Sequence, residues 1–143
     1  MVKWYMGWDL QSHMRTSLVT ESFKRAINKI KGLNEGNLPK MLWHSDQGSQ
    51  YTSYEYVNEI LKVGKISYST KGTPTDNGGQ ESFFGRLKEE TLSEMQECET
   101  LEELKKLVKE KLNYYNYKRL HTRIKYQTPS AFTLISLKNK ISV

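Results

Sequence analysis

The chain has 143 residues, 36% of them hydrophobic and 27% charged, which suits one globular domain and excludes a compositionally disordered chain. No apolar run approaches the roughly 20 residues that span a bilayer, the first residues lack the order of a signal peptide, and the single cysteine excludes an internal disulfide, so we expect a cytoplasmic protein. The formal net charge of +6 and the pI near 9.3 favour a polyanionic partner such as nucleic acid, because Lys and Arg neutralise phosphates.

The N-terminal residues predict a strand followed by a helix. Residues 2–10 alternate large apolar side chains with other residues, which suits a strand exposed on one face. Apolar residues then recur at the helical period over residues 18–30, where Thr16 or Ser17 is expected to cap a helix and Gly32 to end it.

A loop over residues 33–40 leads to a second strand and a second helix. The short apolar run 41–43 is expected to be a buried strand that ends at Asp46. Helical spacing returns over residues 54–63, and Gly64 is expected to close that helix.

The rest of the chain predicts a third strand, a loop and two helices. Residues 65–70 form the strand, and residues 71–79 contain too many glycines and turn formers for regular structure, so a mobile loop is expected there. One helix begins near Gln80 and a longer one near Thr100. This alternation predicts the α/β class, with a sheet that contains parallel strands and helices on its faces.

Two carboxylates stand where such a sheet collects ligands. Asp46 follows a predicted strand at its carboxyl end, and Glu81 lies in the first turn of the helix that the chain enters after returning through a strand and a loop. A converging pair of this kind is how proteins bind Mg²⁺, which prefers oxygen ligands. Each residue also has a purely structural interpretation, an Asx turn for Asp46 and stabilisation of the helix dipole for Glu81, and the residues alone leave both open.

Three blocks of sequence carry a resemblance to a known family. They are HSDQGSQYTS at residues 44–53, DNGGQESFFGRLKEE at residues 76–90 and NYYNYKRLHTRIKYQTPSAF at residues 113–132. In this order they resemble the insertion-sequence transposases whose catalytic core is the retroviral-integrase domain. The resemblance implies a ribonuclease-H-like integrase core followed by a helical C-terminal segment, with a partial core in residues 1–95 and the C-terminal helix and basic tail of the same domain in residues 96–143.

The resemblance also implies the site. Asp46 falls on the second acid and Glu81 on the glutamate of the family's Asp-Asp-Glu triad, so both are predicted to be catalytic and to bind Mg²⁺ or Mn²⁺. In the family, two divalent ions roughly 3.5–4 Å apart activate water or a 3′ hydroxyl and stabilise the leaving oxygen during attack on a DNA phosphodiester. The implied activity is phosphodiester hydrolysis and strand transfer in DNA transposition.

Two features depart from the family pattern. The stretch between Asp46 and Glu81 is one residue shorter than is usual, which a loop can absorb. The first acid of the triad belongs on the first strand, but the chain begins with what resembles the third strand, and Asp9 aligns with a variable position there. We therefore expect an N-terminally truncated core that lacks its first two strands, an open edge on the Asp46 strand, marginal stability and no activity of this chain alone.

Basic side chains near the acids and in the tail are predicted to contact DNA, although solvated lysines on helix faces are the competing explanation. Tyr115 is assigned to the core, and Tyr117 is left open between stacking on bases and packing. The predicted DNA contacts are Lys71, Arg86, Lys88, Lys118, Arg119, His121 and Arg123, with Lys125 close by in the sequence.

Three functions remain in competition at this point. The first is an inactive fragment of a transposase that binds transposon ends and target DNA. The second is a non-catalytic protein that binds DNA or assembles with full-length transposase subunits. The third is an unrelated metal-dependent nuclease, which needs a further carboxylate near the pair, such as Asp76. Metal-dependent cleavage separates these functions from salt-sensitive binding alone.

Overall fold

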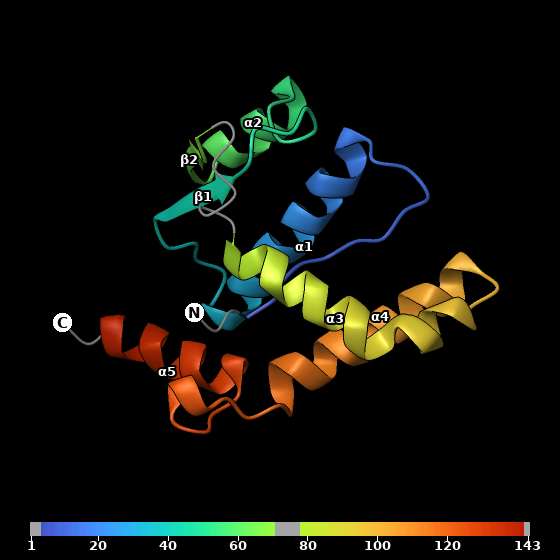
Figure 1. The fold of residues 1–143 in the computed structure, drawn as a ribbon. Coiled ribbons are helices and arrows are strands. Elements are labelled where there is room, and N and C mark those ends of the chain that lie inside the picture. Colours follow the sequence, from blue (N-terminus) through green and yellow to red (C-terminus); the bar gives the residue numbers. More distant parts are fainter. Residues whose placement is uncertain (1–3, 71–77, 142–143) are drawn as a thin grey trace. The chain divides into compact units, whose positions relative to one another are not determined.

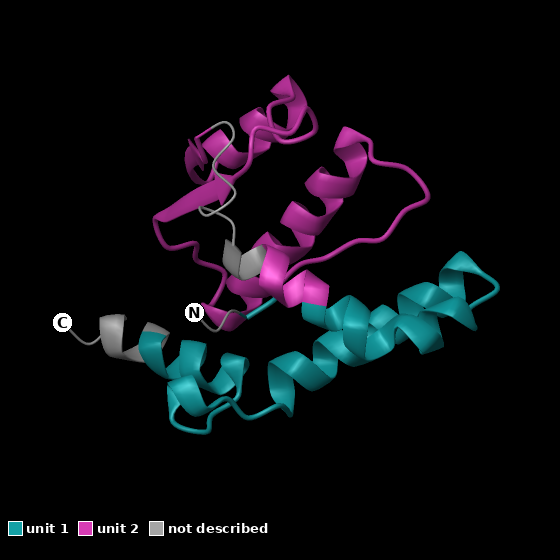
Figure 2. Cartoon of the chain, in the orientation of Figure 1, with its two compact units in different colours: residues 1–5, 86–143 teal, residues 6–85 magenta. Residues whose placement is uncertain are grey.

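A computed structural model describes residues 4–70 and 78–141 (Figure 1). Its elements in chain order are α1 (Thr16–Leu33), β1 (Met41–Ser45), α2 (Tyr54–Leu61), β2 (Gly64–Tyr68), α3 (Gly78–Gln96), α4 (Leu101–Tyr117), a 3₁₀ turn (Thr122–Ile124) and α5 (Pro129–Ile141). They divide into two compact units (Figure 2), which we call the sheet unit (Met6–Gly85) and the helical unit (Met1–Tyr5 with Arg86–Val143). The domain boundary predicted after residue 95 falls at the C-terminal end of α3, inside the helical unit.

The sheet of the sheet unit is the parallel pair β1 and β2, in register from Met41 opposite Gly64 to Ser45 opposite Tyr68. Parallel strands with helices packed on them confirm the predicted mixture of α and β structure. Gly64 does not close the preceding helix, as the sequence had predicted, but begins β2. A Cβ at Gly64 would lie 2.5 Å from the Met41 carbonyl oxygen, so the close approach of the two strands requires glycine here.

A cluster of apolar and aromatic side chains holds α1 and α2 against one face of this sheet. The Phe23 ring of α1 meets the Trp43 ring edge to face, with centroids 4.7 Å apart, and the Tyr56 ring of α2 at 5.9 Å. Such pairs add to the free energy gained from burying the rings. The fully enclosed members of this core are Val19, Phe23, Ile27, Tyr56 and Ile60.

Helix α1 differs from its predicted ends. Its N-cap is Arg15, which makes no side-chain capping hydrogen bond, so the expected caps Thr16 and Ser17 lie inside the helix. The helix also continues through Gly32 to Leu33. The side chains that α1 buries against the core therefore stabilise the helix more than capping hydrogen bonds at its ends do, as is usual for helices that pack on a core.

The strand predicted for residues 2–10 is wrong for the residues described, since residues 4–10 form no strand. A strand needs a neighbour that supplies hydrogen bonds, and in the described residues the sheet consists of β1 and β2 alone. Within the sheet unit, residues 6–10 pack on α1 instead. A Cβ on Gly7 would lie 2.1 Å from the Ser22 carbonyl oxygen, so the backbone there lies directly against the helix.

The helical unit is fastened by polar contacts. Thr100 and Glu103 form a complete capping box at the start of α4, which begins within a residue of its predicted position. The Asn116 side chain is buried and pairs with the Tyr5 backbone in both directions, accepting from its N–H at 3.0 Å and donating to its carbonyl oxygen at 2.9 Å. Asn116 thus holds the Tyr5 backbone much as a neighbouring strand would. Among the described residues, no helix is long and apolar enough to cross a membrane.

Candidate functional site

Asp46 and Glu81 line one cavity of the sheet unit, with a volume of about 370 Å³. Asp46 directly follows β1, and Glu81 lies in the first turn of α3. No lysine or arginine of the described residues lines this cavity, although the chain contains 22 of them. Its walls come from α1, β1, α2 and the segment at Gly7, and its lining residues are Gly7, Val19, Ser22, Phe23, Ala26, Trp43, His44, Ser45, Asp46, Tyr51, Tyr56 and Glu81.

The Asp46 carboxylate has a local partner as well as the cavity. Its Oδ1 accepts a hydrogen bond from the Gly48 N–H at 2.9 Å, which is the Asx turn that the sequence left open. A Cβ at Gly48 would lie 3.0 Å from that oxygen, so glycine allows the turn to close tightly. Within the described residues, neither Asp46 nor Glu81 forms an ion pair. The turn therefore orients Asp46 without neutralising it.

Tyr51 is a cavity residue that the sequence analysis did not single out. Burial, and secondarily the negative charge of Asp46, raise the pKa of its phenol above the ordinary value. Its carbonyl oxygen accepts a hydrogen bond from the Tyr68 hydroxyl at 3.1 Å, which ties the turn after Asp46 to the end of β2. The available signal was its position in the polar turn that begins at Asp46.

Two further polar groups of the lining are buried and have no hydrogen-bond partner in the described structure, the Trp43 Nε1 and the Ser45 Oγ. Both precede Asp46 on β1, on the face of the sheet that carries the core. Two unpartnered polar atoms in the wall that holds the carboxylates make this wall more polar than an ordinary core surface.

His44 and Asp9 occupy structural positions. His44 Nδ1 lies 3.0 Å from the Ser67 Oγ of β2, within hydrogen-bond distance. Asp9 is tied by its Oδ1 to Arg25 at 3.1 Å and by its Oδ2 to the Gln11 amide at 2.7 Å. Both oxygens of Asp9 are thus engaged.

Both carboxylates supply the oxygen ligands that a divalent cation prefers, and no lysine or arginine of the described residues lines the cavity to compete for them. The number of ligands is small. In residues 4–70 and 78–141, no group of three or more His, Cys, Asp and Glu side chains is placed to hold a metal ion. Asp76 and Asn77 lie outside the described residues.

The predicted DNA contacts, except Lys71, which lies outside the described residues, belong to the helical unit. Arg119 is already paired, with its Nη1 at 3.2 and 3.1 Å from the two carboxylate oxygens of Glu90. The side chains of the remaining cations, Arg86, Lys88, Lys118 and Arg123, are exposed and form no ion pair in the described structure. They are therefore free to meet phosphate, whereas Arg119 would first have to leave Glu90.

His121 packs against the aromatic side of α4. Its ring lies edge to face with Tyr115, 5.0 Å between centroids, and Tyr115 in turn contacts the Tyr5 ring at 5.5 Å. Burial, followed by the positive charges of Arg119 and Arg86, lowers the pKa of His121. This environment therefore favours the neutral form of His121. Tyr117, which the sequence left undecided, contacts the Trp4 ring at 6.3 Å.

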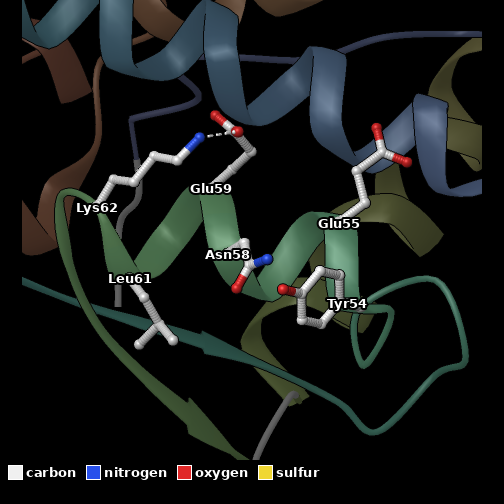
Figure 3. A pocket seen from close by; sticks show the side chains of 6 residues that line it. All are labelled: Tyr54, Glu55, Asn58, Glu59, Leu61 and Lys62. Carbon is white, nitrogen blue, oxygen red and sulfur yellow. Dashed lines mark hydrogen bonds and ion pairs between the residues drawn. The ribbon is translucent and has the colours of Figure 1, made fainter.

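A second hollow, of about 560 Å³, lies along α2 (Figure 3). Lys62 and Glu59 form an ion pair beside it, and Tyr54 at its edge is 84% exposed. None of its lining residues belongs to the predicted site.

Comparison with known proteins points in one direction. The family model described as the integrase core domain matches residues 64–129. The chain is 37% identical over 128 residues to the transposase for insertion sequence element IS904 of Lactococcus lactis, covering 89% of this chain and 49% of that protein. It is 34% identical over 133 residues to an uncharacterised transposase-like protein of Haemophilus influenzae, covering 92% of this chain and 58% of that protein.

A third similar protein is the uncharacterised 31 kDa protein of insertion element IS600 from Shigella sonnei, 38% identical over 94 residues, covering 64% of this chain and 34% of that protein. The chain thus spans about half the length of the first two relatives, or less of the third. No solved structure matches the chain significantly.

Proposed function

This chain belongs to the insertion-sequence transposases with an integrase-type core, and we propose that it forms part of a cytoplasmic, metal-dependent DNA strand transferase whose metal ligands include Asp46 and Glu81. One observation carries the proposal. The two acids line the same cavity, and no lysine or arginine of the described residues lines it with them. A site for a hard cation between oxygen ligands needs such surroundings.

Each protein group in this proposal has one task. A bound Mg²⁺ or Mn²⁺ would activate water or a 3′ hydroxyl and stabilise the oxygen that leaves a DNA phosphodiester. Asp46 is held for ligation by the Gly48 N–H on one oxygen, which leaves the second oxygen for the cation. Glu81 approaches from the first turn of α3.

We further propose that these 143 residues do not cleave DNA by themselves. Mg²⁺ keeps several of its waters and is held by one or two carboxylates together with substrate phosphates, so two carboxylates suit one ion better than two. Asp9 offers no third ligand while Arg25 and Gln11 occupy both of its oxygens. The lack of a group of three ligand side chains among the described residues supports the same limit.

A second function, DNA binding or assembly with full-length transposase subunits without catalysis, is favoured by a separate observation. Lys118 and Arg123 follow one another closely after α4, are exposed and form no ion pair among the described residues. Unpaired cations at the surface are what counterion release from DNA requires.

One experiment tests both proposals. The chain is mixed with labelled duplex and single-stranded oligonucleotides, and cleavage and binding are measured with Mg²⁺, with Mn²⁺ and with EDTA. We expect binding that weakens steeply with salt, and no cleavage. Metal-dependent nicking that disappears in Asp46→Asn would contradict the proposed inactivity while supporting the site. Equal nicking by the chain and by Asp46→Asn would exclude Asp46 as a ligand that the reaction needs.

A further inference from the structure

The loop that follows α4 is closed by its own backbone. The His121 N–H donates to the Gln127 carbonyl oxygen at 3.1 Å, and the Tyr126 N–H donates to the His121 carbonyl oxygen at 3.0 Å. Between them the 3₁₀ turn Thr122–Ile124 buries Ile124, which is 7% exposed. The loop thus has one buried anchor and a fixed outline.

Two neighbouring residues of this loop hold a conformation that their side chains disfavour. Lys125 and Tyr126 both have φ near +56°, in the left-handed region. Glycine adopts this region freely and asparagine more readily than most residues, whereas in most other residues it strains the backbone. Nothing in the backbone requires Lys or Tyr at these two positions, so their side chains need another explanation.

The side chains of Lys125 and Tyr126 are both exposed, and the neighbouring residues in the sequence are rich in Lys and Arg. Tyr126 is 69% exposed, and Arg123 and Lys125 are exposed as well. Among the described residues, no side-chain hydrogen bond or ion pair engages any of the three. Residues 118–128 contain four Lys and Arg (Lys118, Arg119, Arg123 and Lys125) and no Asp or Glu. The loop therefore presents one exposed ring directly after two exposed cations that form no ion pair among the described residues.

From this arrangement we propose that the loop is a contact site for single-stranded DNA, in which Tyr126 stacks on an unpaired base and Arg123 and Lys125 meet the flanking phosphates. Every base offers a π-face to an aromatic ring, and a track of cations beside the ring follows the sugar-phosphate backbone. In a duplex the same base faces are covered by their neighbours, so an isolated ring on a tight loop suits an unpaired strand. The inference rests on the proposed function, since it names the form of DNA that the helical unit takes.

The test compares binding of single-stranded and duplex DNA of one sequence to the full chain, by fluorescence anisotropy at fixed salt. The main variant is Tyr126→Asn, because asparagine removes the ring while it tolerates the left-handed backbone. We expect it to weaken single-strand binding about tenfold, within the range reported for one stacked base, and to change duplex binding much less. Tyr126→Phe keeps the ring and should bind as the natural chain does.

The controls separate stacking from general effects. Tyr54→Ala removes a ring that is 84% exposed in the sheet unit and should leave both affinities unchanged. Lys125→Gln should weaken binding of both DNA forms and lower the salt dependence by about one phosphate contact. Circular dichroism confirms that each variant is folded.

The outcomes distinguish the loop from the function. If the natural chain binds neither DNA form at low salt, the proposed function fails. If it binds DNA but Tyr126→Asn binds single strands equally well, the proposed function stands and the stacking site is wrong. If Tyr126→Asn weakens both forms to the same extent, the ring does not read unpaired bases, and the inference is overturned.

Discussion

The two units of this chain are stabilised by different kinds of contact. In the sheet unit, rings from α1, α2 and β1 pack on one another, and the two acids lie in the wall of that packing. In the helical unit, polar contacts join ring contacts such as that of Tyr115 with Tyr5, since Asn116 holds the Tyr5 backbone and Arg119 pairs with Glu90. Burial of large rings is worth more free energy than single hydrogen bonds or exposed ion pairs. We therefore expect the sheet unit to be more sensitive to the loss of a side chain than the helical unit.

The largest effect is expected from Phe23→Ala. Its ring is 5% exposed and contacts both Trp43 and Tyr56, so removal leaves a cavity at the centre of the sheet unit. The free energy of unfolding should fall by about 4 kcal/mol, measured by urea denaturation. Phe84→Ala is the matched control, because this ring is 45% exposed and should cost under about 1 kcal/mol. Equal losses in the two variants would contradict the aromatic core.

The next effect is expected from Gly7→Ala. The added Cβ would meet the Ser22 carbonyl oxygen at 2.1 Å and the Ala26 nitrogen at 2.5 Å, both of them backbone atoms. The segment has to move away from α1, at a cost of about 3 kcal/mol in the same denaturation experiment. Gly32→Ala has open space around its Cβ and lies in a helix, so it should be neutral or slightly stabilising. A neutral Gly7→Ala would show that the backbone at Gly7 does not lie against α1 as described.

In the helical unit, Asn116→Ala should cost about 2 kcal/mol, because it leaves the N–H and the carbonyl oxygen of Tyr5 without their partner. Asn113→Ala, on the exposed side of the same helix, is the control and should change stability little. Urea denaturation of both variants measures the loss of free energy of unfolding, which is then compared with the loss in Phe23→Ala of the sheet unit. A loss in Asn116→Ala larger than that in Phe23→Ala would reverse it.

The smallest effect is a dependence on pH. Because burial and two arginines lower the pKa of His121, the unfolded chain binds a proton there more readily than the folded chain does. This contribution to stability is present above about pH 6.5, the ordinary histidine value, and is lost as the pH falls below it. We expect a loss of well under 1 kcal/mol between pH 7 and pH 5.5, reduced in His121→Gln. A stability that rises as the pH falls through this range would contradict the direction.

Local signals in the sequence predicted much of this fold. Apolar spacing marked α1, α2, α4 and the two paired strands, whereas the capping residues expected for α1 were wrong. The predicted strand at residues 2–10 failed because alternation alone does not supply a partner, and the polar side chain of Asn116 took that place for Tyr5. Gly64 was misread for a related reason, since its role depends on the Met41 carbonyl oxygen of another strand.

The site was predictable only in part. The sequence singled out Asp46 and Glu81 as candidate ligands, because each lies at the end or start of an element, and left open an Asx turn at Asp46. It missed Tyr51, whose place in the cavity depends on how the turn folds back. The ion pair between Arg119 and Glu90 joins helix α3 to the residues after α4, and no local pattern indicates which of many acids an arginine will meet. Long-range contacts of this kind decide which cations form ion pairs and which stay unpaired among the described residues.

The central claim is that Asp46 and Glu81 together bind one divalent cation. Mn²⁺ titration of the chain, with free Mn²⁺ measured by electron paramagnetic resonance, tests it most directly. The account predicts weak binding of one ion per chain that is lost in Asp46→Asn and in Glu81→Gln, and kept in Glu89→Gln, which lies on the same helix outside the cavity. Unchanged Mn²⁺ binding in both acid variants would contradict it.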